Sequence, residues 1–325
     1  MEIAAATQGG VVSERSGLSD LDVALLDAMV GLGALADRPH TKSARVLDEL
    51  YRTTGIAPGY GYEVMSNLAV PWLVNVPVLD PHGNFGSPDF GPSNPRYTEV
   101  RLSDVGMLAV EAERGGPPVP IGMINGDIHV EGSRPPFEPV RVIDALTLAA
   151  NRPTVSDEEL RHVLGPPSFP TDCAVDGDID ELLIAEPCRL TLRARMTREA
   201  VRGRNVIVVS ALPPMASNSD IAATIKSRAA ERPWHRDHSE LAAATRLPVA
   251  DVNDESHNQV SRLVITLKPE ADVVAVEAQL RELWGIAITV TAQLRAPAAA
   301  LLRGWVANCA DDPLIGLNRL RAVVS

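Results

Sequence analysis

The spacing of apolar residues changes once along this chain, at the Gly/Pro-rich turn 165–170, and this change constrains the fold more than any other feature. Before the turn, apolar side chains recur every three or four residues, as at Leu21, Leu25 and Met29, which is typical of helices. After the turn they alternate with polar residues, which is typical of strands with one buried face. This second half is predicted to hold strands at 188–197, 205–210, 262–267 and 286–294 and helices at 219–230 and 271–284. The pattern therefore predicts an α+β fold.

The first half is predicted to begin with three short helices, at 18–35, 43–51 and 63–70, followed by an extended segment at 72–79. That order is typical of a helix-turn-helix with a wing. Residues 80–97 are rich in Gly and Pro and are predicted to form a loop, and a helix is predicted over 98–113. A loop of this length inside a compact unit usually has a function.

Composition narrows the class of protein. The length of 325 residues suggests about two domains. No run of 18 apolar residues and no N-terminal apolar segment is present, so we expect neither a membrane span nor a signal peptide. Three widely separated cysteines argue against a disulfide framework or a cysteine-paired metal site, and no metal ligands are predicted. We expect a reduced, cytoplasmic protein.

Two sequence blocks in the long loop carry the strongest signal. The first is Gly83–Ser87 (GNFGS), and the second is Arg96–Glu99 (RYTE), followed by Arg101 and Leu102. In order and spacing they resemble the active-site loop of bacterial type IIA DNA topoisomerase A subunits, the family of DNA gyrase and topoisomerase IV. Weaker matches lie at 42–46 (KSARV) and 165–171, so the resemblance extends over roughly residues 18 to 305.

The resemblance implies a domain organisation. Residues 1–18 are small, Gly-rich and aperiodic and are predicted to form a flexible arm. The resemblance suggests a winged-helix breakage-reunion domain at 19–150 and an α+β tower domain at 151–300, which leaves a C-terminal tail at 301–325. No long heptad pattern follows, so we expect neither a coiled coil nor a C-terminal β-propeller, and the chain resembles a divergent and truncated member of the family.

The resemblance also assigns a chemical role to the loop. Tyr97 matches the tyrosine that attacks DNA and forms a tyrosyl-DNA phosphodiester. A phenol has an ordinary pKa near 10 and needs activation, and an adjacent arginine such as Arg96 can hold the scissile phosphate and stabilise its developing charge. An isolated tyrosine here would more simply be a half-buried aromatic at a helix start. The neighbouring matches favour the nucleophile.

Five further residues are candidates for DNA contact. Lys42 and Arg45 are expected to share a basic face with Tyr97 and Arg96. Ile128 aligns approximately with an isoleucine that family members wedge between bases, although an ordinary strand residue is an equal alternative. Arg193 and Arg195 lie in a dense arginine run and are predicted to share one strand face, either contacting phosphate or forming part of a solvated hairpin.

Two departures from the family leave two functions open. Residues 54–61 stand where the family has a histidine-containing motif and hold neither histidine nor acid, and Asp22–Leu25 replaces a family arginine pair. The net charge of −12 also differs from the basic balance usual in DNA-binding proteins. One interpretation is an impaired homodimeric topoisomerase that binds double-stranded DNA and relies on a gyrase B-like partner for Mg²⁺ and ATP, with no cofactor in this chain. The other is a catalytically inactive paralogue that regulates gyrase or binds DNA.

Overall fold

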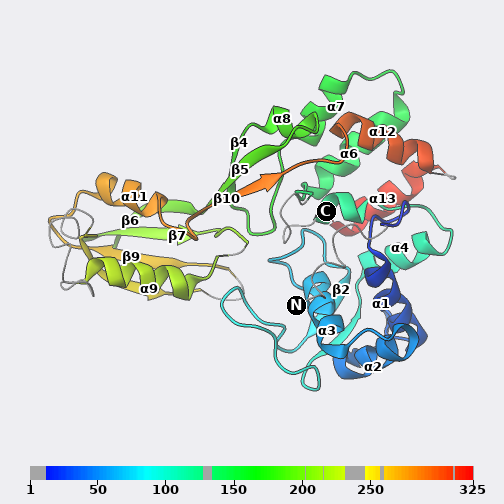
Figure 1. Cartoon of the computed structure of the whole chain (residues 1–325), viewed down its shortest axis with the longest axis horizontal. Coiled ribbons are helices and arrows are strands. Elements are labelled where there is room, and N and C mark those ends of the chain that lie inside the picture. Colours follow the sequence, from blue (N-terminus) through cyan, green and yellow to red (C-terminus); the bar gives the residue numbers. More distant parts are fainter. Residues whose placement is uncertain are drawn as a thin grey trace.

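The computed structural model describes residues 12–126, 134–201, 203–214, 216–230, 246–256, 260–309 and 312–324. The chain is a mixed α+β structure (Figure 1) with two main hydrophobic cores. The larger core is mainly helical. The smaller lies against a four-stranded sheet and contains residues between Ala194 and Ile288.

The first three helices pack on one another, and their ends are set by capping residues. They are α1 (Asp20–Gly31), α2 (Ser43–Thr54) and α3 (Pro58–Ala69). Ser19 accepts the N–H of Asp22 in a capping box before α1, and Gly55 ends α2 in the left-handed conformation at φ 76°. The helix predicted from residue 63 begins at Pro58 instead, because proline suits the first position of a helix.

A three-stranded antiparallel sheet forms the wing of this unit, in the order β1-β3-β2. Its strands are β1 (Thr41–Lys42), β2 (Leu79–His82) and β3 (Glu99–Leu102). The helix predicted over 98–113 is therefore wrong at its start. In β3, Val100 and Leu102 are buried and their neighbours are not, which is the period of a strand. α4 (Asp104–Glu113) begins only after Ser103, whose hydroxyl accepts the N–H of Gly106.

Six more helices complete the larger core: α5 (Ile121–Asn125), α6 (Pro139–Asn151), α7 (Asp157–Leu164), α8 (Ile179–Leu183), α12 (Ala298–Asn308) and α13 (Pro313–Val324). Residues 301–325 were expected to be a tail, but α12 and α13 pack on α6, and Leu302, Leu317 and Leu320 are fully buried. The described part of the expected N-terminal arm is also packed, since Ser16 and Leu18 are buried.

The described part of the second half contains two antiparallel sheets. One has the order β10-β5-β4, from β4 (Ala174–Gly177), β5 (Cys188–Arg193) and β10 (Ala287–Ala292). The other has the order β6-β7-β9-β8, from β6 (Arg195–Val201), β7 (Arg204–Ser210), β8 (Val249–Asp254) and β9 (Leu263–Leu267). The strand predicted over 188–197 is thus divided at Ala194 between two sheets.

Within the described residues, two helices cover the four-stranded sheet. They are α9 (Asn218–Ala229) and α11 (Val273–Arg281), and Ile221 and Leu280 lie in one cluster with Ile207 of β7. Val206 and Val208 of the same strand belong to a separate buried cluster. Because successive side chains of a strand point to opposite faces, β7 is buried on both, which explains its continuous apolar run.

The α+β prediction is confirmed. Neither a coiled coil nor a β-propeller is present among the described elements. Within the same residues, no helix is both long enough and apolar enough to cross a membrane.

Candidate nucleic-acid interface

The loop between β2 and β3 turns at two glycines, whose backbone conformations other residues rarely adopt. Gly83 and Gly86 have φ angles of 95° and 96°, in the region that favours glycine. A side chain on Gly86 would place its Cβ 2.7 Å from the carbonyl oxygen of Phe90. The Asn84 side chain accepts the Gly86 N–H at 2.8 Å, and its carbonyl accepts the Ser93 N–H at 2.9 Å. The GNFGS block is therefore the folded base of the loop.

Tyr97 is at the end of this loop with its side chain 68% exposed. The Arg96 guanidinium carbon lies 5.8 Å from the centroid of the Tyr97 ring, within reach of a cation–π contact. Asn94 fixes both residues: its side-chain oxygen accepts the Arg96 Nε at 3.1 Å, and its carbonyl accepts the Tyr97 N–H at 2.8 Å. A phenol and a guanidinium are thus presented together to solvent.

The next residue, Thr98, is fully buried and attaches the loop to two helices. Its hydroxyl donates to the Ser43 Oγ at 2.9 Å and lies 3.0 Å from the Tyr62 hydroxyl. Tyr62 donates in turn to the carbonyl of Ser93 at 2.7 Å, and burial raises the pKa of its phenol. Sequence reasoning did not single out this anchor, although Thr98 lies inside the RYTE block.

Lys42 and Arg45 lie beside the loop, at the start of α2. The N–H groups of the two residues between them donate to the loop, Ser43 to the carbonyl of Thr98 at 3.0 Å and Ala44 to that of Pro95 at 3.2 Å. Lys42 Nζ is 2.8 Å from a carboxylate oxygen of Glu99, and this contact lowers the pKa of Glu99. Arg45 is exposed. The structure thus places Lys42 and Arg45 next to the Tyr97 segment, with the charge of Lys42 partly neutralised.

The other candidate DNA contacts are not gathered at this site. Arg193 ends β5 and pairs with Asp176 at 2.6 Å, whereas Arg195 begins β6 and pairs with Asp172 at 2.9 Å. The prediction that they share one strand face is wrong, because Ala194 separates two strands of different sheets. Ile128 lies outside the described residues.

Two histidines lie on the wing. The His40 and His82 ring centroids are 5.4 Å apart, and His40 Nε2 is 3.2 Å from an Asp80 carboxylate oxygen, close enough for a charge contact but without hydrogen-bond geometry. Sequence reasoning noted His82 as a loop residue and missed His40. No group of three or more potential metal ligands occurs in the part of the chain that the structure describes.

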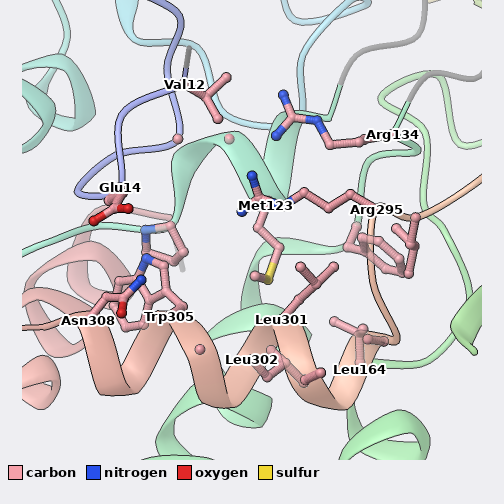
Figure 2. Close-up of a pocket in the computed structure, with 18 of the residues that line it drawn as sticks. Val12, Glu14, Met123, Arg134, Leu164, Arg295, Leu301, Leu302, Trp305 and Asn308 are labelled. Carbon is pink, nitrogen blue, oxygen red and sulfur yellow. The ribbon is translucent and has the colours of Figure 1, made fainter. Parts of the chain in front are cut away.

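A separate cavity of about 470 Å³ lies away from this loop (Figure 2). Met123, Leu301 and Trp305 line its apolar wall, and Arg134 and Arg295 lie at one end. None of the residues predicted from the sequence to act on DNA lines it. The cavity therefore does not form part of the candidate interface.

A winged helical unit with an exposed Arg-Tyr pair on its hairpin loop is followed by an antiparallel α+β unit, and this mixed α+β arrangement is consistent with the N-terminal region of type IIA topoisomerase A subunits. No family model matches the chain. Three curated relatives, all of them gyrase A proteins by name, are those of Granulibacter bethesdensis (32% identical over 293 residues, 80% of this chain), Aminobacterium colombiense (29% over 300 residues, 82%) and Streptococcus pneumoniae (28% over 288 residues, 79%). Over about 80% of its length the chain is therefore similar to gyrase A proteins at 28–32% identity, as expected of a divergent gyrase A-like protein.

The match covers only part of each relative. It takes in 30% of the Granulibacter protein, 35% of the Aminobacterium protein and 33% of the Streptococcus protein. The chain therefore spans about a third of the length of these relatives.

Proposed function

We propose that this chain is the breakage-reunion part of a gyrase A-like topoisomerase and that Tyr97 forms the covalent bond to DNA. The supporting observation is the exposed Tyr97 phenol beside Arg96, on a loop whose two ends are fixed by Asn84 and Thr98. A nucleophile held in place needs little further ordering to reach a phosphate on bound DNA.

The proposed step exchanges one phosphodiester for another. The Tyr97 phenol gives up its proton as its oxygen bonds to phosphorus, the bond from phosphorus to a sugar oxygen breaks, and that sugar oxygen takes up a proton as a hydroxyl. Reversal by the same hydroxyl restores the strand. Arg96 stabilises the charge on the phosphate oxygens during both directions. The resemblance implies that a gyrase B-like partner supplies Mg²⁺ and ATP hydrolysis, that the chain acts as a homodimer on double-stranded DNA, and that it works in the cytoplasm.

A second candidate function, that of a catalytically inactive regulator, is supported by the residues around the Tyr97 loop and by the pairing of the basic side chains. Residues 54–61 carry no histidine or acid, and Lys42, Arg193 and Arg195 are each paired with a carboxylate. Fewer side chains are therefore available to neutralise a DNA phosphate than a full cleavage site requires. A protein with these properties could bind DNA or gyrase as a catalytically inactive regulator.

Substitution of the tyrosine separates the two functions. With supercoiled plasmid, Mg²⁺ and a gyrase B protein, a competent site yields a protein–DNA adduct that is trapped by detergent. Tyr97→Phe should abolish the adduct without changing the thermal midpoint, because it removes only one exposed oxygen. Tyr51→Phe is the matched control, since Tyr51 is a 56% exposed tyrosine on α2 and should retain full adduct yield.

Adduct that persists in Tyr97→Phe would contradict the assignment of the nucleophile. No adduct from the unmodified chain, with duplex binding retained at about 50 mM salt, would instead support the regulatory function.

A further inference from the structure

Phe90 has the highest exposed fraction of the large hydrophobic residues in the described part of the chain, 75%. It lies in the β2–β3 loop, four residues after Gly86 and seven before Tyr97. A single exposed aromatic is common on protein surfaces and needs no explanation by itself. Phe90 differs from such isolated residues because the backbone of its turn is held by several hydrogen bonds.

The backbone holds Phe90 in a tight turn. The Ser87 N–H donates to the Phe90 carbonyl at 2.8 Å, and the Phe90 N–H donates back to the Ser87 carbonyl at 3.2 Å and to the Ser87 hydroxyl at 3.2 Å. Gly86 allows the close approach of this carbonyl. The ring is therefore presented to solvent by an ordered backbone and not by a free loop tip.

The preceding residue, Asp89, fixes this turn to the second half of the chain. Its Oδ1 accepts the Ser217 hydroxyl at 2.7 Å, the Ser219 N–H at 2.9 Å and the Ser219 hydroxyl at 3.0 Å, and its Oδ2 lies 3.5 Å from Asn218 Nδ2. These groups form the N-terminus of α9, where a carboxylate is favoured by the helix dipole. In Figure 1 the loop that follows β2 extends toward α9.

This contact, which we call the Asp89–α9 clamp, also affects electrostatics. The Asp89 carboxylate keeps its negative charge, but its donors hold it at the N-terminus of α9, where the helix dipole partly offsets that charge. The loop can therefore approach DNA while Arg96 remains its exposed charge next to Tyr97. An exposed aromatic ring on the same loop as an exposed arginine is a combination that suits contact with an unstacked base.

We propose that Phe90 stacks on a DNA base at an opened step of the duplex and that the Asp89–α9 clamp positions its ring. This inference rests on the proposed function, because it requires DNA to lie along the Tyr97 loop. The ligand class is double-stranded DNA with a locally unstacked base, as at a nick or a mismatch.

The test compares an intact duplex with the same duplex carrying one nick, with 2-aminopurine at the nick as a fluorescent reporter of stacking. The unmodified chain should prefer the nicked duplex. Phe90→Ala should lower affinity for the nicked duplex about 5- to 150-fold, the range expected for one stacked base, and leave the intact duplex unaffected. Phe90→Trp should retain the preference, because it keeps an aromatic face.

Two further variants identify the role of the clamp. Asp89→Ala should reduce the preference for the nicked duplex without changing the circular dichroism spectrum, because the ring remains but is no longer held. Trp284→Ala is the matched control: this aromatic is 65% exposed, lies outside the loop and should have no effect.

The outcomes separate this inference from the proposed function. If the unmodified chain binds neither duplex at low salt, both are wrong. If it binds both and Phe90→Ala keeps the same preference and the same 2-aminopurine signal, the proposed function stands and the role of Phe90 is refuted.

Discussion

Tyr97 and Thr98 are adjacent in the chain and have opposite environments, one 68% exposed and the other fully buried. The alternation of β3 explains this, since Thr98, Val100 and Leu102 are all buried on one side. Extending the same alternation back by one residue turns Tyr97 outward. The register of the wing therefore decides which side chain of the RYTE block can meet a substrate.

Thr98→Val tests the anchor at the residue scale. The substitution keeps the shape but leaves the hydroxyls of Ser43 and Tyr62 without this partner. We expect the free energy of unfolding to fall by about 1–3 kcal/mol in urea titrations, the usual cost of an unsatisfied buried polar group. Thr53→Val, on the exposed side of α2, should change it by less than about 0.5 kcal/mol. Equal effects of the two variants would show that the buried contacts contribute nothing.

At the scale of elements, the loop and α9 are separate in sequence but joined by Asp89. Desolvation acts to raise the pKa of Asp89, but hydrogen bonds from Ser219, Ser217 and Asn218 together lower it below its ordinary value. A depressed folded-state pKa means that the carboxylate stabilises the folded state above the unfolded pKa. That contribution is lost as pH falls through the folded value.

The clamp should therefore release in acid. We expect protection factors for amides of the 83–94 loop to fall in hydrogen exchange as pH drops below about 4, since an unfolded aspartate titrates near 3.9. Asp89→Ala should show low protection at every pH. A loop whose protection is the same in both proteins at neutral pH would contradict the clamp, whatever happens in acid.

At the scale of the whole molecule, the larger core is closed by its last helices. Leu317 and Leu320 of α13 are fully buried, and a side chain on Gly316 would lie 2.0 Å from the carbonyl oxygen of Pro118. Arg319 of the same helix pairs with Glu111 of α4 at 2.6 Å, and this lowers the pKa of Glu111. The segment expected to be a tail thus supports the unit that carries Tyr97.

Leu320→Ala should destabilise this unit. Removing a fully buried leucine typically costs about 2–5 kcal/mol, so we expect a clear fall in the thermal midpoint. Ile315→Ala is the comparison, because Ile315 is 48% exposed on the same helix and should have a small effect. If Leu320→Ala unfolds at the same temperature as the unmodified chain, α13 is not part of the cooperative core.

The sequence by itself determined the features that depend only on residues close together in the chain, such as the period of apolar residues and the positions of turns. The change of period at 165–170 predicted the α+β fold, and the Gly83 and Gly86 turns are required by positive φ angles that a side chain disfavours. The two motif blocks led to the exposed Tyr97 and Arg96. The helix predicted at 98–102 was wrong because a short apolar segment fits both periods. The segment 188–197 has the predicted strand period, but local pattern does not show that its two halves join different sheets.

Only the tertiary structure decided which distant groups meet. Thr98 finds Ser43 and Tyr62 across 55 and 36 residues of chain, and Asp89 finds Ser217 across 128. The tertiary structure also decides which charges pair. The sequence indicates no partner for Arg193 or Arg195, but in the structure each guanidinium lies against a carboxylate. Hydrogen bonds and ion pairs act over a few ångströms, so their partners are fixed by the path of the backbone and not by local pattern.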